Sequence, residues 1–210
     1  MIILSHRGYW KSADEKNTEV AFERSFTLGF GTETDVRDFN GGLVISHDVP
    51  NGREISFEKF LRIADRFSRG GRLVLALNVK ADGLSERVSG EIRKYCNLDC
   101  FLFDMSVPDM RDHLRRDIPV FTRMSEVENP PVWLDRCSGV WLDSFETEWF
   151  SNSIILELLT LNKRICIVSP ELHGRDHMDF WQRIKPLANE PMLMLCTDYP
   201  EQAREFFRIN

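Results

Sequence analysis

The chain has 210 residues, of which 42% are hydrophobic and 29% charged, an ordinary composition for a globular protein that can bury a sizeable core. Its net charge of −6 argues against a general nucleic-acid binder, because such proteins are usually basic. We expect no membrane-spanning helix, since no apolar stretch reaches ~18 residues, and no signal peptide, since the start of the chain lacks a basic segment and a cleavage site.

Strand and helix signals alternate from one end of the chain to the other. Short, largely apolar runs predict strands at Met1–Ser5, Thr32–Val36, Leu43–Ser46, Leu73–Val79, Cys100–Phe103, Val120–Arg123, Val140–Leu142, Arg164–Val168 and Met192–Cys196. Capping residues or helical spacing of apolar residues predict helices at Asn17–Leu28, Ser56–Phe67, Leu84–Tyr95, Pro108–Arg115, Ser153–Leu161, Asp179–Ala188 and Glu201–Phe207. Gly41-Gly42 predicts a turn, which makes Leu43–Ser46 the return strand of a hairpin. Pro130-Pro131 argues against a long helix between residues 128 and 136.

With the hairpin return counted inside the second unit, the pattern contains eight strand–helix units. Alternating strands and helices imply a parallel sheet, and eight units imply an α/β fold of the (β/α)8 TIM-barrel type with a β-hairpin extension in the second unit. A doubly wound open sheet is the alternative that the pattern leaves open. No linker, low-complexity tract or repeat divides the chain, so residues 1–210 are expected to form a single domain.

Groups suited to phosphate chemistry follow the expected strands. His6 and Arg7 come directly after the first strand, and His47 follows the hairpin return. Glu33 and Asp35 are two residues apart on a strand, so both carboxylates point to one face and can share a bound cation. Arginine can hold phosphate oxygens, a cation can polarise them, and imidazoles can transfer protons near neutral pH. The pattern indicates metal-assisted chemistry on a phosphate ester at the C-terminal ends of the strands.

Five short motifs in the chain resemble those of a known protein family. They are HRG at His6–Gly8, NT at Asn17-Thr18, ExD at Glu33–Asp35, HD at His47-Asp48 and TDYP at Thr197–Pro200. In this order they resemble the motifs of the glycerophosphodiester phosphodiesterase family, within the wider group that includes bacterial phosphatidylinositol-specific phospholipase C. The resemblance covers almost the whole chain, and it implies the same barrel and a phosphoric diester hydrolase.

The resemblance also implies roles for the basic residues. His6 and His47 would form an acid–base pair, His6 as general base and His47 as general acid on the leaving oxygen, although the sequence does not fix which does which. Arg7 and Lys80 would contact the phosphoryl oxygens. The alternative for Arg7 is an ion pair with one of the two carboxylates of the ExD motif.

The expected metal ligands depart from the family at one position. Glu33 and Asp35 supply oxygen ligands, which suit Mg²⁺ or Ca²⁺ rather than zinc. The family's third ligand is a glutamate in an E-x-K motif, whereas this chain has Asn78-Val79-Lys80. The amide oxygen of Asn78 can still bind such an ion, but it brings no charge. We therefore expect a weaker site, unless Glu171 after the seventh strand acts as a compensating ligand.

A second polar cluster, residues 171 to 177, follows the seventh strand and precedes a helix. His173 and Arg175 are candidates for binding a second anionic group of the substrate, and a solvated loop with local pairs is the alternative. Trp141, at the end of the sixth strand, is a candidate for lining the leaving-group pocket. Plain packing explains an aromatic residue at that place nearly as well.

The function expected from the sequence is a cytoplasmic, metal-dependent phosphodiesterase that cleaves a small glycerophosphodiester-like molecule to an alcohol and a phosphomonoester. The five cysteines, odd in number and without CxxC spacing, are expected to be buried thiols in a reducing compartment. Two other functions stay open: a lyase that releases a cyclic phosphate, and a phosphodiester-binding protein that has lost turnover. The neutral Asn78 favours the last of these.

Overall fold

The structure is a computed structural model that describes residues 1–68 and 71–209. Its strands are β1 (Ile2–His6), β2 (Gly31–Phe39), β3 (Gly42–Ile45), β4 (Leu73–Val79), β5 (Leu98–Phe103), β6 (Phe121–Met124), β7 (Gly139–Leu142), β8 (Arg164–Val168) and β9 (Leu193–Thr197). Its helices are α1 (Glu19–Thr27), α2 (Phe57–Phe67), α3 (Ser85–Ile92), α4 (Val107–His113), α5 (Asn152–Thr160), α6 (Met178–Ile184) and α7 (Pro200–Phe207). Short 3-10 helices are η1 (Ala13–Glu15), η2 (Pro170–His173) and η3 (Lys185–Leu187). Each predicted strand and helix is found, with bounds that differ by a few residues.

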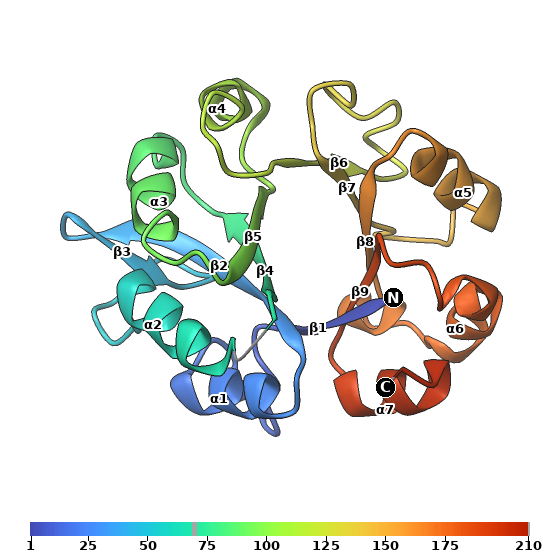
Figure 1. The fold of residues 1–210 in the computed structure, drawn as a ribbon, viewed down its shortest axis with the longest axis horizontal. Coiled ribbons are helices and arrows are strands. Elements are labelled where there is room, and N and C mark those ends of the chain that lie inside the picture. Colours follow the sequence, from blue (N-terminus) through green and yellow to red (C-terminus); the bar gives the residue numbers. More distant parts are fainter. Residues whose placement is uncertain (69–70, 210) are drawn as a thin grey trace.

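Eight parallel strands form a nearly closed barrel in the order β5-β4-β2-β1-β9-β8-β7-β6. The first and last strands of this order, β5 and β6, meet at a narrow seam. There Leu102 pairs with Val120, and the Leu102 N–H donates to the Pro119 carbonyl at 2.9 Å. Figure 1 shows the helices outside the strands, α1 to α4 around one half of the barrel and α5 to α7 around the other. The predicted (β/α)8 barrel is confirmed, and the open sheet is excluded.

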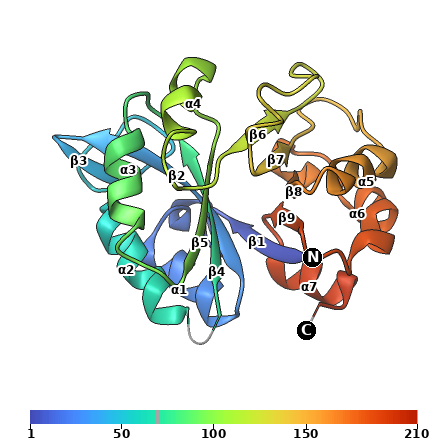
Figure 2. The same ribbon diagram turned by 45° about the horizontal axis from the view of Figure 1, so that its top comes forward.

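The predicted hairpin in the second unit is also confirmed. β3 pairs antiparallel with β2, and Asn40 and Gly41 at the turn have left-handed φ values of +48° and +76°. Figure 2 shows the hairpin projecting outward beside α2 and α3. After β3 the chain returns to the end of the barrel, where the Ser46 N–H donates to the Asp35 carbonyl at 3.0 Å.

Local sequence explains where helices begin and where one is missing. Ser56 caps α2, because its hydroxyl accepts the Lys59 N–H at 3.1 Å. Between β6 and β7 no helix forms, and the Asn129–Pro130 bond in that segment is cis. The fifth strand–helix unit thus has no helix, as the proline pair predicts. None of the helices in the described ranges has the length and hydrophobicity needed to cross a bilayer.

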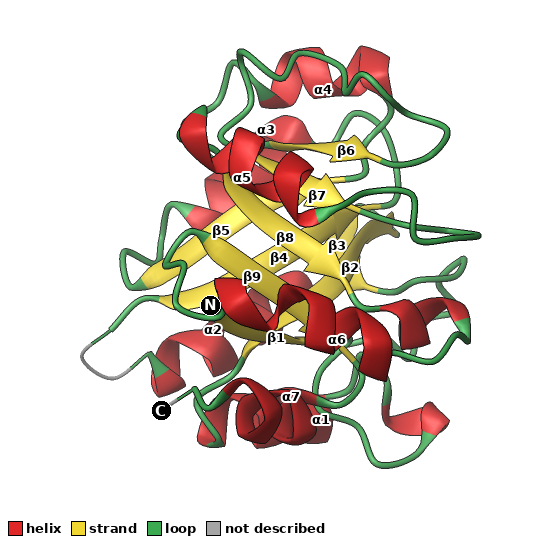
Figure 3. Ribbon diagram, turned by 90° about the vertical axis from the view of Figure 1, so that its right-hand side faces the viewer, coloured by secondary structure: helices red, strands yellow, loops and turns green. Residues whose placement is uncertain are grey.

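Aromatic rings fill the interior of the barrel. Phe101 stacks on Phe121 with 3.9 Å between ring centroids, and Phe103 stacks on Trp141 with 3.8 Å. At the N-terminal end of the strands, the guanidinium of Arg164 on β8 donates two hydrogen bonds, of 2.9 and 2.8 Å, to the carboxylate of Asp99 on β5, across the barrel. Figure 3 shows this strand core enclosed by helices. The interior of the barrel is thus packed, and the polar residues expected at the site lie at the opposite end of the strands.

Candidate active site

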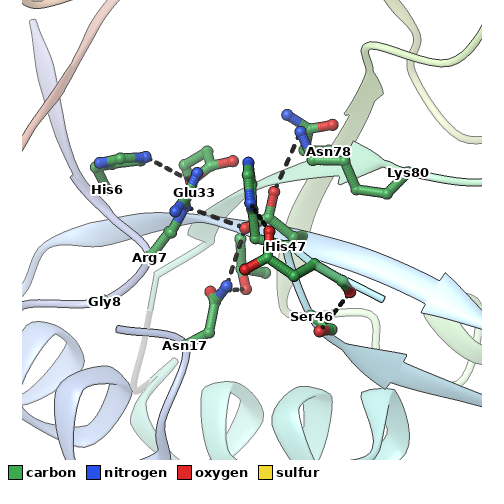
Figure 4. Close-up of polar contacts among 12 residues, drawn as sticks. His6, Arg7, Gly8, Asn17, Glu33, Ser46, His47, Asn78 and Lys80 are labelled. Atoms are coloured by element: carbon green, nitrogen blue, oxygen red, sulfur yellow. Dashed lines mark hydrogen bonds and ion pairs between the residues drawn. The ribbon is translucent and has the colours of Figure 1, made fainter. Parts of the chain in front are cut away.

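Charged and polar side chains gather at the C-terminal ends of three consecutive strands. His6 is the last residue of β1, Glu33 and Asp35 lie in β2, and Asn78 lies near the end of β4. The register of the parallel strands places His6 beside Glu33, and Asp35 beside Asn78. The structure thus brings these four predicted site residues together. Figure 4 labels three of them, His6, Glu33 and Asn78.

Asp35 is fully buried, and cationic and amide groups surround it. Arg7 Nε lies 3.2 Å from Asp35 Oδ2, and Lys80 Nζ lies 3.4 Å from Asp35 Oδ1. The Asn17 side chain donates to Oδ2 at 2.9 Å, and the Thr34 hydroxyl donates to Asn17 at 2.8 Å. The ion pair that was the alternative role of Arg7 is therefore present. Arg7 and Lys80 share one carboxylate.

Three buried oxygens of the cluster accept no hydrogen bond from the described residues, namely Glu33 Oε2, Asp35 Oδ1 and Asn78 Oδ1. Their side chains belong to residues that are 3%, 0% and 6% exposed, so bulk water does not solvate them freely. Burying such polar atoms without a partner is costly. Carboxylate and amide oxygens are the ligands that Mg²⁺ and Ca²⁺ prefer, so this donor set fits a hard divalent cation.

The negative charge of the cluster also favours binding of a cation. Burial and the neighbouring Asp35 raise the pKa of Glu33 well above its usual range, and Arg7 and Lys80 oppose this rise to a smaller extent. Among the described residues, no three His, Cys, Asp or Glu side chains converge closely enough to hold a metal ion by themselves. The amide oxygen of Asn78 is the further protein oxygen of this cluster that could serve a cation as a ligand.

His6 forms a hydrogen-bonded pair with Asp198, the residue after β9. His6 Nδ1 lies 2.7 Å from Asp198 Oδ1, and His6 Nε2 lies 4.0 Å from Glu33 Oε2. Because a carboxylate only accepts hydrogen bonds, Nδ1 of the neutral ring carries the proton and Nε2 keeps a free lone pair. Burial lowers the pKa of His6, and the hydrogen bond to Asp198 opposes this. In the sequence, Asp198 is recognisable as part of the TDYP motif and by its place just after the last predicted strand, without an assigned role.

The backbone of the turn after β1 fixes the place of Arg7. Arg7 has a left-handed φ of +57°, and its N–H donates to the Glu33 carbonyl at 2.9 Å. Gly8 has a φ of +81°, and a Cβ at this position would lie 2.8 Å from the Cβ of Ala21 in α1. Glycine is required here because helix α1 lies directly against the turn.

His47 lies on the loop after β3, and its side chain is 43% exposed. Its Nδ1 is 2.8 Å from Asp48 Oδ1. His47 and Arg7 line one cavity of about 510 Å³, and the lining also includes the basic side chains of Lys16 and Arg53. The second histidine therefore stands at a solvent-open cavity that shares Arg7 with the acidic cluster.

Glu171 lies in η2, and its carboxylate is already engaged. The hydroxyls of Ser169 and Thr197 donate to its two oxygens, and the Asp198 N–H donates to one of them at 3.1 Å. No hydrogen bond or ion pair among the described residues directly links Glu171 to the residues around Glu33. The observed bonds of Glu171 instead hold the segment that carries Asp198.

The other predicted substrate contacts are also engaged within the protein. His173 Nε2 lies 2.7 Å from Asp143 Oδ1, and the Arg175 side chain donates to the Ser144 carbonyl. Trp141 is only 5% exposed and stacks inside the barrel, as described above. Local pairs and packing, the alternatives weighed from the sequence, describe what these three side chains do in this structure.

Comparison with known proteins identifies the fold. No family model and no curated protein sequence matches the chain. A phosphodiesterase from Oleispira antarctica, in complex with the product sn-glycerol-3-phosphate, has a TM-score of 0.72 at 14% identity, covering 99% of this chain and 97% of that one. A glycerophosphodiester phosphodiesterase from Agrobacterium tumefaciens has a TM-score of 0.69 at 16% identity, covering 98% of each chain. A Ca²⁺-dependent phosphatidylinositol-specific phospholipase C from Streptomyces antibioticus has a TM-score of 0.65 at 9% identity, covering 98% and 95%. At these identities the likeness shows a shared fold along nearly the whole chain.

Proposed function

We propose that this protein is a metal-dependent phosphodiesterase that hydrolyses a small glycerophosphodiester-like molecule to an alcohol and a phosphomonoester. The observation that carries the proposal is the set of buried oxygens on Glu33, Asp35 and Asn78 that accept no hydrogen bond from the described residues, next to His6 and Arg7. The proteins that share the fold support it, since they include glycerophosphodiester phosphodiesterases and a Ca²⁺-dependent phospholipase C.

Glu33, Asp35 and Asn78 would hold Mg²⁺ or Ca²⁺, which supplies positive charge that polarises the phosphoryl oxygens when it is bound. Arg7 and Lys80 would contact the phosphoryl oxygens of a substrate bound beside these ligands. Both side chains lie at the cluster, since each forms an ion pair with Asp35. Glu171 stays a candidate ligand, although two hydroxyls already donate to its oxygens.

His6 is the proposed general base. Its Nε2 takes the proton of a substrate hydroxyl beside the phosphate, and that oxygen bonds to phosphorus while the bond to the leaving oxygen breaks. Asp198 keeps the Nδ1 proton in place and stabilises the imidazolium that forms. His47 gives a proton to the leaving oxygen. Water then opens the cyclic phosphate: His47 takes the water proton, and His6 returns its proton to the ring oxygen that leaves.

His173, Arg175 and Trp141 stay candidates for further substrate contacts. His173 already contacts Asp143 and Arg175 already donates to the Ser144 carbonyl, so an anionic group bound there would share these side chains with the existing partners. We also propose a cytoplasmic location, because all five cysteines are free and four of them are buried. Burial raises the pKa of Cys137 to about 11, which suits an unreactive structural thiol.

A phosphorus NMR time course tests the proposed reaction. The purified protein is incubated with a panel of glycerophosphodiesters and Mg²⁺ or Ca²⁺, beside an EDTA control and a His6→Ala preparation that reveals contaminating activity. Ion-dependent appearance of a phosphomonoester supports the proposal. A cyclic phosphate that accumulates without opening indicates the lyase, and the absence of any product across the panel indicates a phosphodiester-binding protein.

A further inference from the structure

We propose that Asp104 is a positioning residue that holds the amide of Asn78 with its oxygen toward the cation site. This inference rests on the proposed function, because it concerns the cation that Glu33 and Asp35 would bind. It assigns a role to a residue outside the motifs, at the one position where the ligand set lacks a carboxylate. A locked amide would supply a fixed oxygen where a third carboxylate is absent.

The orientation of the amide follows from hydrogen-bond chemistry. Asn78 Nδ2 donates to Asp104 Oδ2 at 3.0 Å. A carboxylate accepts hydrogen bonds and cannot donate them, so the NH₂ group of Asn78 must face Asp104. The amide oxygen then faces away from Asp104, and it is the buried Oδ1 that has no partner among the described residues. Without Asp104, nothing in these contacts would prevent the amide from rotating by half a turn.

Asp104 is itself held in place. It follows directly after β5, next to Phe103, which is the β5 partner of Asn78 in the register. The Arg123 side chain on β6 donates to Asp104 Oδ1 at 2.8 Å, and Arg123 Nε donates to Glu128 Oε2 at 2.5 Å. One oxygen of Asp104 is thus fixed by a cation and the other is left for Asn78. This pattern is typical of residues that do not bind the metal themselves but orient a metal ligand through a hydrogen bond.

Asp104 has a second effect that must be separated from the first. Its negative charge attracts a cation through space, whatever the orientation of Asn78. Replacing Asn78 with aspartate distinguishes the two effects, because a carboxylate has two equivalent oxygens and needs no orientation. Loss of the Asp104 charge would weaken ion binding in both backgrounds if it acts through space. If Asp104 acts through the amide, the loss would weaken binding only when Asn78 is present.

The experiment is calorimetric titration of the metal-free full chain with Ca²⁺ and with Mg²⁺. The proteins are wild type, Asp104→Asn, Asn78→Asp and the double variant, and thermal unfolding in EDTA confirms that each is folded. Asp104→Asn is expected to weaken binding about 10–100-fold in the wild-type background. In the Asn78→Asp background the same change is expected to leave affinity unchanged or to tighten it, because it removes an adjacent like charge.

Asp82→Asn is the matched control. Asp82 is exposed, lies four residues after Asn78, and accepts a hydrogen bond from Ser106 at 2.9 Å, so its substitution makes the same charge change without touching the amide. It is expected to change affinity less than about threefold. Equal weakening by Asp104→Asn in both backgrounds, or no weakening in either, overturns the positioning role while leaving the cation site intact. Wild-type protein that binds neither ion overturns both this inference and the proposed metal dependence.

Discussion

Glu33, Asp35 and Asn78 are costly residues for the fold in the absence of an ion. Each has a buried oxygen that accepts no hydrogen bond within the described residues, which costs about 1–3 kcal/mol for an oxygen without any partner. At Asp35 the Lys80 charge, 3.4 Å from Oδ1, offsets part of this cost. An ion that binds only the folded protein would offset this cost. Ion binding and the free energy of unfolding should therefore be coupled at this site.

Addition of Ca²⁺ or Mg²⁺ to metal-free protein is expected to raise its Tm, because a ligand at 100 times its Kd adds about 2.7 kcal/mol to the free energy of unfolding. Glu33→Gln should abolish the shift. It should leave the metal-free protein at least as stable, since it removes one of two neighbouring buried carboxylates. Calorimetric scans in EDTA and in excess ion measure both effects, with the exposed Glu86→Gln as control. Identical wild-type Tm values in the two buffers would contradict the cation site.

Each of the two histidines contacts an aspartate, His6 the largely buried Asp198 and His47 the exposed Asp48. His6→Ala and His47→Ala should each lower kcat by ~10²–10⁴-fold, the usual contribution of general acid–base groups. Asp198→Asn should lower kcat as well, because an amide no longer requires the His6 proton to be on Nδ1. Turnover of the substrate identified by phosphorus NMR is the measurement. Near-wild-type kcat for any one variant would show that its assigned role is wrong.

At the scale of elements, the junction of β1 with α1 depends on the lack of a side chain at Gly8. Gly8 and Gly29 have the same φ of +81°, but a Cβ at Gly8 would lie 2.8 Å from Ala21 Cβ, whereas a Cβ at Gly29 would have nothing within 4 Å. Gly29→Ala should cost about 1 kcal/mol from its backbone conformation. Gly8→Ala should cost at least about 1 kcal/mol more, from the added overlap. Denaturant unfolding of both variants measures the difference, and equal costs would mean that α1 moves aside freely.

Helix α4 contains a buried titratable pair that should make stability depend on pH. His113 is fully buried, its Nε2 lies 3.1 Å from Asp109 Oδ2, and burial lowers its pKa from 6.5. The unfolded chain therefore binds a proton more readily than the folded protein. The contribution of neutral His113 to the free energy of unfolding is therefore fully present above pH 6.5. It decreases as the pH falls below 6.5 and is lost as the pH falls through the lowered pKa of His113.

His113→Gln is expected to remove this part of the pH dependence, since glutamine does not titrate and still offers Asp109 a donor. The free energy of unfolding, measured between pH 5 and pH 8, should fall more steeply on acidification in wild type than in the variant. The difference cannot exceed about 1.4 kcal/mol per pH unit for one proton. Parallel curves below pH 6.5 would show that His113 titrates normally.

At the scale of the whole molecule, the barrel has one narrow seam. β4 and β5 are joined along six residue pairs, whereas within the described residues β5 meets β6 through the single pairing of Leu102 with Val120. Local opening follows the places with the fewest backbone bonds. Hydrogen exchange followed by mass spectrometry should show β6 exchanging faster than β1 and β9, which are paired on both sides. Exchange of β6 as slow as that of β1 would mean that side-chain packing alone closes the barrel.

Much of the fold and part of the candidate site could be predicted from the sequence. Apolar runs, caps and turn residues are local signals, so they predicted the strands, the helices, the hairpin and the missing helix near Pro130. The spacing of Glu33 and Asp35 placed two carboxylates on one face, because side chains alternate along any strand. Residue types alone also indicated which chemistry was available at the strand ends.

Only the tertiary structure decided which of these groups meet. Asp198 pairs with His6 across 192 positions of sequence, and Asp104 meets Asn78 across 26, because the order and register of the strands bring their ends together. The same packing turned Trp141 into the barrel and engaged Glu171 with two hydroxyls. Local patterns carry no information on strand order or register, since these depend on how all the helices and strands bury their apolar faces at once.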